Sequence, residues 1–220
     1  MKEDILEQLV DGYFLRQPAT FTKHNVKFKP KKEDIALFDN QTRGKFSVHS
    51  DIDVLAIHLN EENEKKVSVV SCKSWQDGFD IDLYYNHLID EEKRNVKKGT
   101  GPIWKRFREL VEPNWAKAFR EKIYEETNSY DFTYYIAVTK IKKKSKIEDF
   151  KNCDTFLNLL SDNGKNKVKI EFLTLGDIVS KIINENSNTT VESTEIGRFL
   201  QLIKAAGLEV KALTPKTIFP

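Results

Sequence analysis

Two short apolar segments joined by a polar turn constrain the fold of this chain more than any other part of it. The segments span residues 50–59 and 67–76, and both are rich in Val, Ile and Leu. The turn between them, residues 60–66, carries Asn, Glu and Lys, which is typical of the connection in a β-hairpin. We therefore expect an antiparallel pair of strands here, with a sheet built around it.

Polar residues occupy the outer ends of both predicted strands. Asp51 and Asp53 lie near the start of the first, and Ser71 and Lys73 lie near the end of the second. Because side chains alternate along a strand, each pair is expected to share a face, and antiparallel pairing brings the two ends together. Two carboxylates and one ammonium group at one sheet edge predict a place for a divalent metal and for charge-stabilised chemistry.

The remaining sequence alternates between helical and extended patterns. Helical periodicity or capping signals predict helices at 3–11 (capped by Gly12), within 88–127 (divided at Pro113), at 147–160, from Thr174 to about 184, and from Thr194 to Gly207. Alternating or apolar runs predict strands at 20–28, 132–139 and 167–173. This order predicts an α/β protein with a mixed central sheet flanked by helices.

The length of 220 residues is enough for one sizeable core. We expect an α/β domain over residues 1–186, with a C-terminal helix and tail, 187–220, packed on the same domain. No apolar run approaches the roughly 20 residues that a membrane-spanning helix needs, and acidic residues near the N-terminus argue against an export signal. Only two cysteines occur, Cys72 and Cys153, which favours a reducing cytoplasm and no membrane partner.

Basic residues gather in separated segments of the chain, although the net charge is only +2. Such segments can fold onto one phosphate-facing surface, which predicts a nucleic acid partner. The alternative is that lysine-rich loops only keep the protein solvated. The candidate nucleic-acid-binding residues are Lys27, Lys29, Lys142 and Lys143, together with Gln76 and Trp75 just past the second predicted strand.

The motif at residues 50–73 resembles that of the PD-(D/E)xK nuclease superfamily, which has the restriction-endonuclease-like fold. Asp53, in Ile-Asp-Val-Leu-Ala, is similar to the first acidic position of that motif, and Ser71-Cys72-Lys73 is similar to the (D/E)-x-K part. Glu7 is similar to the acid that members often carry on the first helix. The resemblance implies a Mg²⁺-dependent DNA endonuclease of the restriction or repair type, with Mn²⁺ as an alternative metal.

By this resemblance each residue has an expected role. Asp53 and the backbone carbonyl of Cys72 hold the metal, and the Cys72 side chain points into the core. Lys73 orients or deprotonates the attacking water and balances charge. Asp51 and Glu7 are the candidates to replace the acid that is missing at Ser71. Taken by its place on the first helix alone, Glu7 is either a solvated edge residue or a carboxylate turned toward a site.

Ser71 is the departure that keeps other functions open, because a hydroxyl is a weaker ligand for Mg²⁺ than a carboxylate. One alternative is a nucleic-acid-binding module on the same fold that does not cut. Another is an interaction scaffold that uses the amphipathic segment 104–123 to pair with a partner protein. A homodimer is also open, since cutting both strands of a duplex needs two sites.

Overall fold

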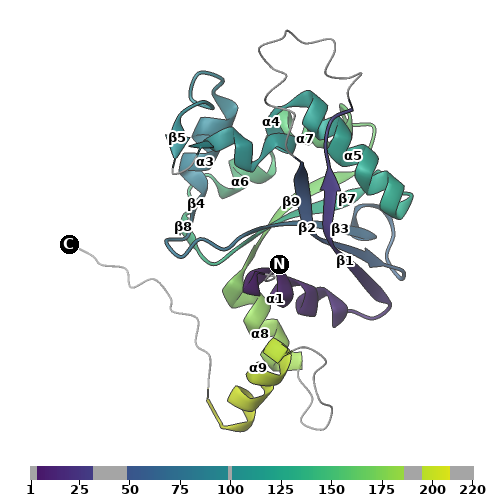
Figure 1. Ribbon diagram of the computed structural model, residues 1–220, viewed down its shortest axis with the longest axis vertical. Helices are drawn as coiled ribbons and strands as arrows, with labels where there is room; N and C mark the ends of the chain where they lie inside the picture. The colour runs from purple at the N-terminus through teal and green to yellow at the C-terminus, as the bar shows by residue number, and fades with distance from the viewer. Residues whose placement is uncertain (1–3, 32–48, 99–100, 186–194, 209–220) are drawn as a thin grey trace, which may run out of the picture.

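The computed structural model describes residues 4–31, 49–98, 101–185 and 195–208, and it is an α/β fold built on one mixed sheet (Figure 1). The strand order is β1-β2-β3-β7-β9. The bounds are Thr20–Phe28 (β1), Ser50–His58 (β2), Val67–Lys73 (β3), Phe132–Val138 (β7) and Val168–Thr174 (β9). Strands β1, β2 and β3 pair antiparallel, whereas β3, β7 and β9 run parallel. The predicted fold class and the predicted hairpin are confirmed.

Helices cover both faces of this sheet (Figure 1). One face carries α1 (Ile5–Leu15), α8 (Leu175–Glu185) and α9 (Glu195–Ala205). The opposite face carries α3 (Ile81–Ile89), α4 (Arg108–Val111), α5 (Pro113–Thr127), α6 (Ile147–Lys151) and α7 (Asp154–Ser161). The shorter elements are η2 (Asn63–Lys65), β4 (Phe79–Asp80), β5 (Lys97–Lys98), β6 (Gly101–Pro102), η3 (Ile103–Arg106) and β8 (Ile141–Lys143).

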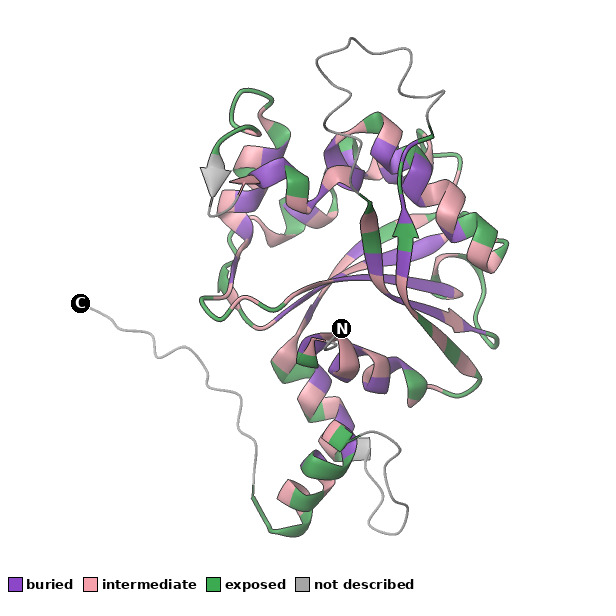
Figure 2. Ribbon diagram, viewed as in Figure 1, coloured by how far each residue is buried: buried purple, intermediate pink, exposed green. Residues whose placement is uncertain are grey.

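The buried apolar side chains form two clusters, one on each face of the sheet. Figure 2 marks the buried positions along the helices and strands. The larger cluster packs α3–α7 onto the sheet, and the smaller cluster packs α1, α8 and α9 onto the other face. The predicted apolar stripe within 104–123 lies wholly in the larger cluster, as Trp115 and Phe119 illustrate. This stripe is therefore not free to bind a partner, as the scaffold alternative required.

Two local signals fix the starts of helices as predicted. Pro113 is the first residue of α5, where its missing N–H costs nothing. At α8, the Thr174 hydroxyl donates to Asp177 Oδ2 over 2.6 Å and accepts from the Asp177 N–H over 3.2 Å. This reciprocal arrangement satisfies backbone groups that a helix start leaves open.

Two of the predicted helices have different limits in the structure. The prediction that Gly12 ends the first helix is wrong, because α1 continues to Leu15 and buries Phe14 against the smaller cluster. The helical reading of 88–127 is only partly right: η3, β5, β6 and turns precede α4. In both cases tertiary packing decides where the helix lies, and local glycine signals do not.

The C-terminal helix α9 places Leu200 in the smaller cluster beside α1 and α8. Residues 209–220 of the predicted tail lie outside the described residues. Among the residues that are described, no helix combines the length and apolar character needed to cross a bilayer.

Candidate active site

The β2–β3 hairpin brings Asp53, Ser71 and Lys73 together. Val54 pairs with Val70, so the next position along the register sets Asp53 opposite Ser71. The Cys72 N–H donates to Asp53 Oδ2 over 2.6 Å, and Lys73 Nζ donates to Ser71 Oγ over 2.7 Å. The convergence that the sequence predicted at this sheet edge is present.

Side-chain alternation along β2 breaks beside Asp53. Ile52 and Leu55 both pack in the larger cluster, while Val54 packs in the smaller one. On the neighbouring strand the pairing passes over Asn25, whose φ is 52°. The two carboxylates differ in accessibility, since Asp51 is exposed and Asp53 is partly buried.

Burial raises the pKa of Asp53 to about 6, against an ordinary 3.8. The charge of Lys73 and the Cys72 N–H both lower this pKa, and the charges of Asp51 and Glu109 raise it. Since burial outweighs both stabilising contacts, the Asp53 carboxylate lies where additional positive charge would stabilise it.

Glu7, on α1, belongs to the same cluster of charges. Burial, and after it the neighbouring charge of Asp53, raise its pKa to about 7 from an ordinary 4.5. The start of α1 is tied to the end of β3, because Asp4 caps Leu6 N–H over 2.8 Å and accepts from Ser74 Oγ over 2.5 Å. Glu7 is thus half-buried, and its charge interacts with those of Asp53, Asp4 and Asp51.

Glu109, the most deeply buried carboxylate of this region, was not predicted from the sequence. It lies on α4, is only 5% exposed, and accepts a hydrogen bond from the Tyr134 hydroxyl of β7. Burial raises the pKa of Glu109, while the Tyr134 hydrogen bond and the charge of Lys73 lower it. Tyr134 also shares a hydrogen bond with Ser71, so Glu109 is linked to the position where an acid is missing.

Nothing in the sequence around Glu109 distinguishes it from a surface carboxylate. It stands beside apolar residues of a four-residue helix, and a surface carboxylate would give the same pattern. Only the packing of α4 against β7 reveals that its side chain points inward.

The donors at this edge suit a hard cation such as Mg²⁺. In the described part of the chain, no group of three His, Cys, Asp or Glu side chains is arranged to hold a metal. Magnesium sites, however, often use one or two carboxylates and complete their shell with water and substrate phosphate. Asp53 and Glu7 are two such carboxylates, and Asp53 Oδ1 accepts no hydrogen bond from the described residues.

The Cys72 side chain takes no part in this chemistry. It packs against the smaller cluster, as expected, and burial and the charge of Asp53 raise the pKa of its thiol far above the ordinary value. Cys72 can therefore contribute only its backbone carbonyl.

The predicted nucleic-acid-binding residues fall into two groups. Gln76 is exposed, Trp75 stacks on Tyr84 at 5.3 Å between ring centres, and Lys142 and Lys143 on β8 pair with nearby carboxylates over 2.8 and 3.9 Å. In the second group, Lys27 near the end of β1 and Lys29 just after this strand are both exposed. Lys27 lies directly across from Asp51 in the β1–β2 register, which places this group beside the carboxylates.

Comparisons of the chain with protein-family models, with curated proteins and with solved structures give no match.

Proposed function

We propose that the protein is a Mg²⁺-dependent endonuclease that hydrolyses phosphodiester bonds in DNA. The observation that carries the proposal is the cluster of Asp53, Lys73 and Ser71 on two paired strands, with the pKa of Asp53 raised. The mixed sheet, three antiparallel strands continued by parallel β7 and β9, supports a restriction-endonuclease-like architecture for the same proposal.

Each residue has a physical task in this reaction. Asp53, the Cys72 carbonyl and Glu7 would hold Mg²⁺, which when bound lowers the pKa of a water and offsets phosphate charge. Lys73, held on Ser71 Oγ, is placed to hydrogen-bond the attacking water and to balance charge in the transition state. Glu109, acting through Tyr134, would orient the Ser71 hydroxyl.

Ser71 need not disable the site, because other carboxylates surround Lys73. The charge of Lys73 lowers the pKa of both Asp53 and Glu109, so it interacts with both carboxylates. The charge of Asp51 in turn raises the pKa of Asp53 and of Glu7. The negative charge that an acid at position 71 would supply is thus available from neighbouring positions.

Plasmid cleavage tests the proposal. We expect nicking or linearisation with Mg²⁺ or Mn²⁺, reduced at least about a hundredfold in Asp53→Asn and Lys73→Met, since each removes charge from the reacting centre. The matched controls Glu62→Gln and Lys65→Met, at the far turn of the same hairpin, should cut like the unmodified chain. Equal cleavage by all variants would contradict the assignment.

Metal binding can be measured without cleavage. Mg²⁺ should raise the melting temperature at pH 8 and much less at pH 5, because Glu7 and Asp53 must lose their protons to bind it. Asp53→Asn should abolish the shift, whereas Glu62→Gln should keep it. A shift that survives in Asp53→Asn would place the metal elsewhere.

A second candidate function is DNA binding without cleavage. It is favoured by Ser71 Oγ already being occupied by Lys73, and by the absence of a three-carboxylate group among the described residues. It predicts salt-dependent DNA binding, with no cleavage under any divalent metal.

The proposal includes a homodimer for cutting both strands of a duplex. It also includes action in the cytoplasm, which is supported by Cys72 and Cys153 both being free.

A further inference from the structure

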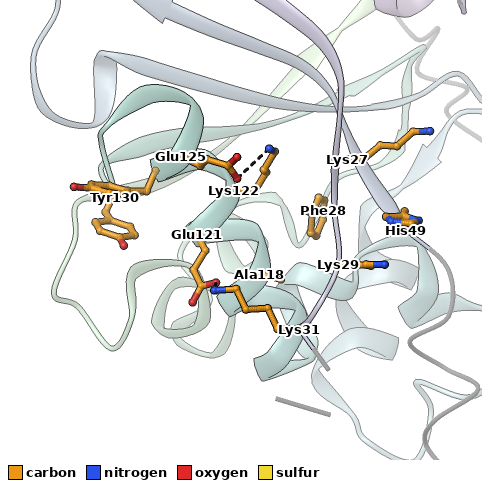
Figure 3. Close-up of a pocket in the computed structure, with 11 residues that line it drawn as sticks. Lys27, Phe28, Lys29, Lys31, His49, Ala118, Glu121, Lys122, Glu125 and Tyr130 are labelled. Carbon is orange, nitrogen blue, oxygen red and sulfur yellow. Dashed lines mark hydrogen bonds and ion pairs between the residues drawn. The ribbon is translucent and has the colours of Figure 1, made fainter. Parts of the chain in front are cut away.

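A pocket of about 580 Å³ opens between the end of β1 and helix α5 (Figure 3). Strand β1 contributes Lys27, the residues just after it contribute Lys29, and α5 contributes Lys122 and Tyr124. Tyr130, from the turn after α5, completes the aromatic wall. The pocket begins next to the candidate active site, because Lys27 lies across from Asp51 in the strand register.

The lysines of this pocket differ in whether their charge is neutralised. Lys31 pairs with Glu121 over 2.8 Å, and Lys122 pairs with Glu126 over 2.9 Å. Lys27 and Lys29 form no ion pair with any residue that the structure describes. In Figure 3 both point to the same side of β1 as His49. Two exposed ammonium groups, on Lys27 at the end of β1 and on Lys29 just after it, suit two phosphates of a nucleic acid backbone.

The aromatic wall suits a base. The rings of Tyr124 and Tyr130 stack 4.3 Å apart and 12° from parallel, yet they remain 42% and 39% exposed. Both rings line the pocket and stay partly exposed, and aromatic side chains exposed in this way can stack on unpaired bases. Bases of a duplex stack on each other and cannot reach such a platform, whereas those of a single strand can.

We infer that a single-stranded segment of DNA binds across this pocket and over β1, with phosphates on Lys27 and Lys29, which point away from α5 in Figure 3, and an unpaired base on Tyr124 of α5. The inference deepens the proposed function and rests on it for the choice of DNA. The substrate of the candidate active site would then be DNA that is single-stranded, or whose base pairs are locally opened, on the β1 side of the cleaved bond.

Anisotropy titration of a fluorescein-labelled 20-nucleotide strand, in EDTA, tests the inference with the full chain. Lys27→Ala/Lys29→Ala should weaken binding roughly tenfold and lower the salt slope by about 1.4, which corresponds to two lost phosphate contacts on a single strand. The matched control is Lys65→Ala/Lys66→Ala, which removes the same charge from the far turn of the hairpin. This variant should keep the salt slope of the unmodified chain.

The aromatic part has its own matched pair. Tyr124→Ala should weaken single-strand binding at least about fivefold, and Tyr124→Phe, which keeps the ring, should bind like the unmodified chain. Melting temperatures within a few degrees of the unmodified chain would establish that both variants are folded.

Three outcomes would overturn the inference: equal salt slopes for the two double-lysine variants, equal affinity of Tyr124→Ala and Tyr124→Phe, or duplex binding as tight and as sensitive to Tyr124→Ala as single-strand binding. Because the titrations are done in EDTA, without a divalent metal, they measure binding independently of cleavage. A chain that never cuts can still bind through the pocket, and a chain that cuts can fail these binding tests.

Discussion

The carboxyl group of Asp53 is held where its charge is poorly solvated, so it should destabilise the fold whenever it is ionised. Its pKa is about 6 in the folded chain against an ordinary 3.8. Because the folded pKa is raised, the associated stability is present below about pH 4 and is lost as the pH rises through 6. A residue selected for stability alone would not carry this charge.

Asp53→Asn should therefore stabilise the protein at high pH. We expect its free energy of unfolding to exceed that of the unmodified chain by about 1–3 kcal/mol at pH 8, and the two to converge near pH 4. Urea unfolding across this range measures the difference. The amide can still accept the Cys72 N–H, so the packing is kept. Asp51→Asn is the control, since this exposed neighbour should shift stability little at either pH; a pH-independent effect of Asp53→Asn would argue against the raised pKa.

At the scale of elements, one buried contact joins α4 to β7: the hydrogen bond from Tyr134 to Glu109. Tyr134→Phe removes the donor and leaves a buried carboxylate without its partner, which should cost about 1–3 kcal/mol. Glu109→Met alone removes the acceptor of the Tyr134 hydroxyl, which then keeps only its contact with Ser71, and should also destabilise the fold. The double variant should recover much of the loss, because two apolar groups can replace a buried polar pair.

A double-mutant cycle by urea unfolding measures this coupling. The control is a second cycle that combines Tyr135→Phe with Glu109→Met, since Tyr135 is the next residue of β7. The losses there should add. Additive losses for Tyr134 and Glu109 as well would mean that the two side chains do not interact.

Elements with local chemical signals were predictable from the sequence, and those decided by packing were not. The strand at 20–28, the start of α5 at Pro113 and the Thr174–Asp177 cap each follow from residues close in the chain. The prediction that the first helix ends at Gly12 was wrong because a glycine can lie inside a helix when the surrounding face is buried.

The residues of the candidate site also differ in whether local sequence signals predict them. Asp53, Ser71 and Lys73 lie on one hairpin, so pairing rules alone bring them together. Glu109 reaches them from a helix, through a tyrosine on a third strand, and no local pattern encodes that path. Tyr124 belongs to the same helical stretch as the buried stripe but is turned to the surface, which became visible only once α5 was placed.

At the scale of the whole molecule, most of the packing lies on one side of the sheet. Phe119, in the larger cluster, is 2% exposed and contacts the rings of Phe28, Phe132 and Tyr134 at 5.2–5.8 Å. Phe199, on α9, is 61% exposed.

The same substitution at these two positions should have very different effects. Phe119→Ala should lower the free energy of unfolding by about 3–5 kcal/mol, because it leaves a cavity in the larger cluster. Phe199→Ala should change it by less than about 0.5 kcal/mol. Denaturant midpoints of the two variants measure this contrast, and similar losses would mean that α9 is covered in solution.

The central position of β3 also bears on how the chain folds during synthesis. Its partner on one side, β2, is next to it in the sequence, whereas its partner on the other side pairs Ser68 with the distant Thr133. Local pairs close quickly, and distant ones pay the entropy of a long loop first. A chain leaving the ribosome can thus form the hairpin that holds Asp53 and Lys73 well before Tyr134 is made. Tyr134 and Glu109 can join them only after β7 has emerged and docked, so the emerging chain would carry an incomplete centre until then.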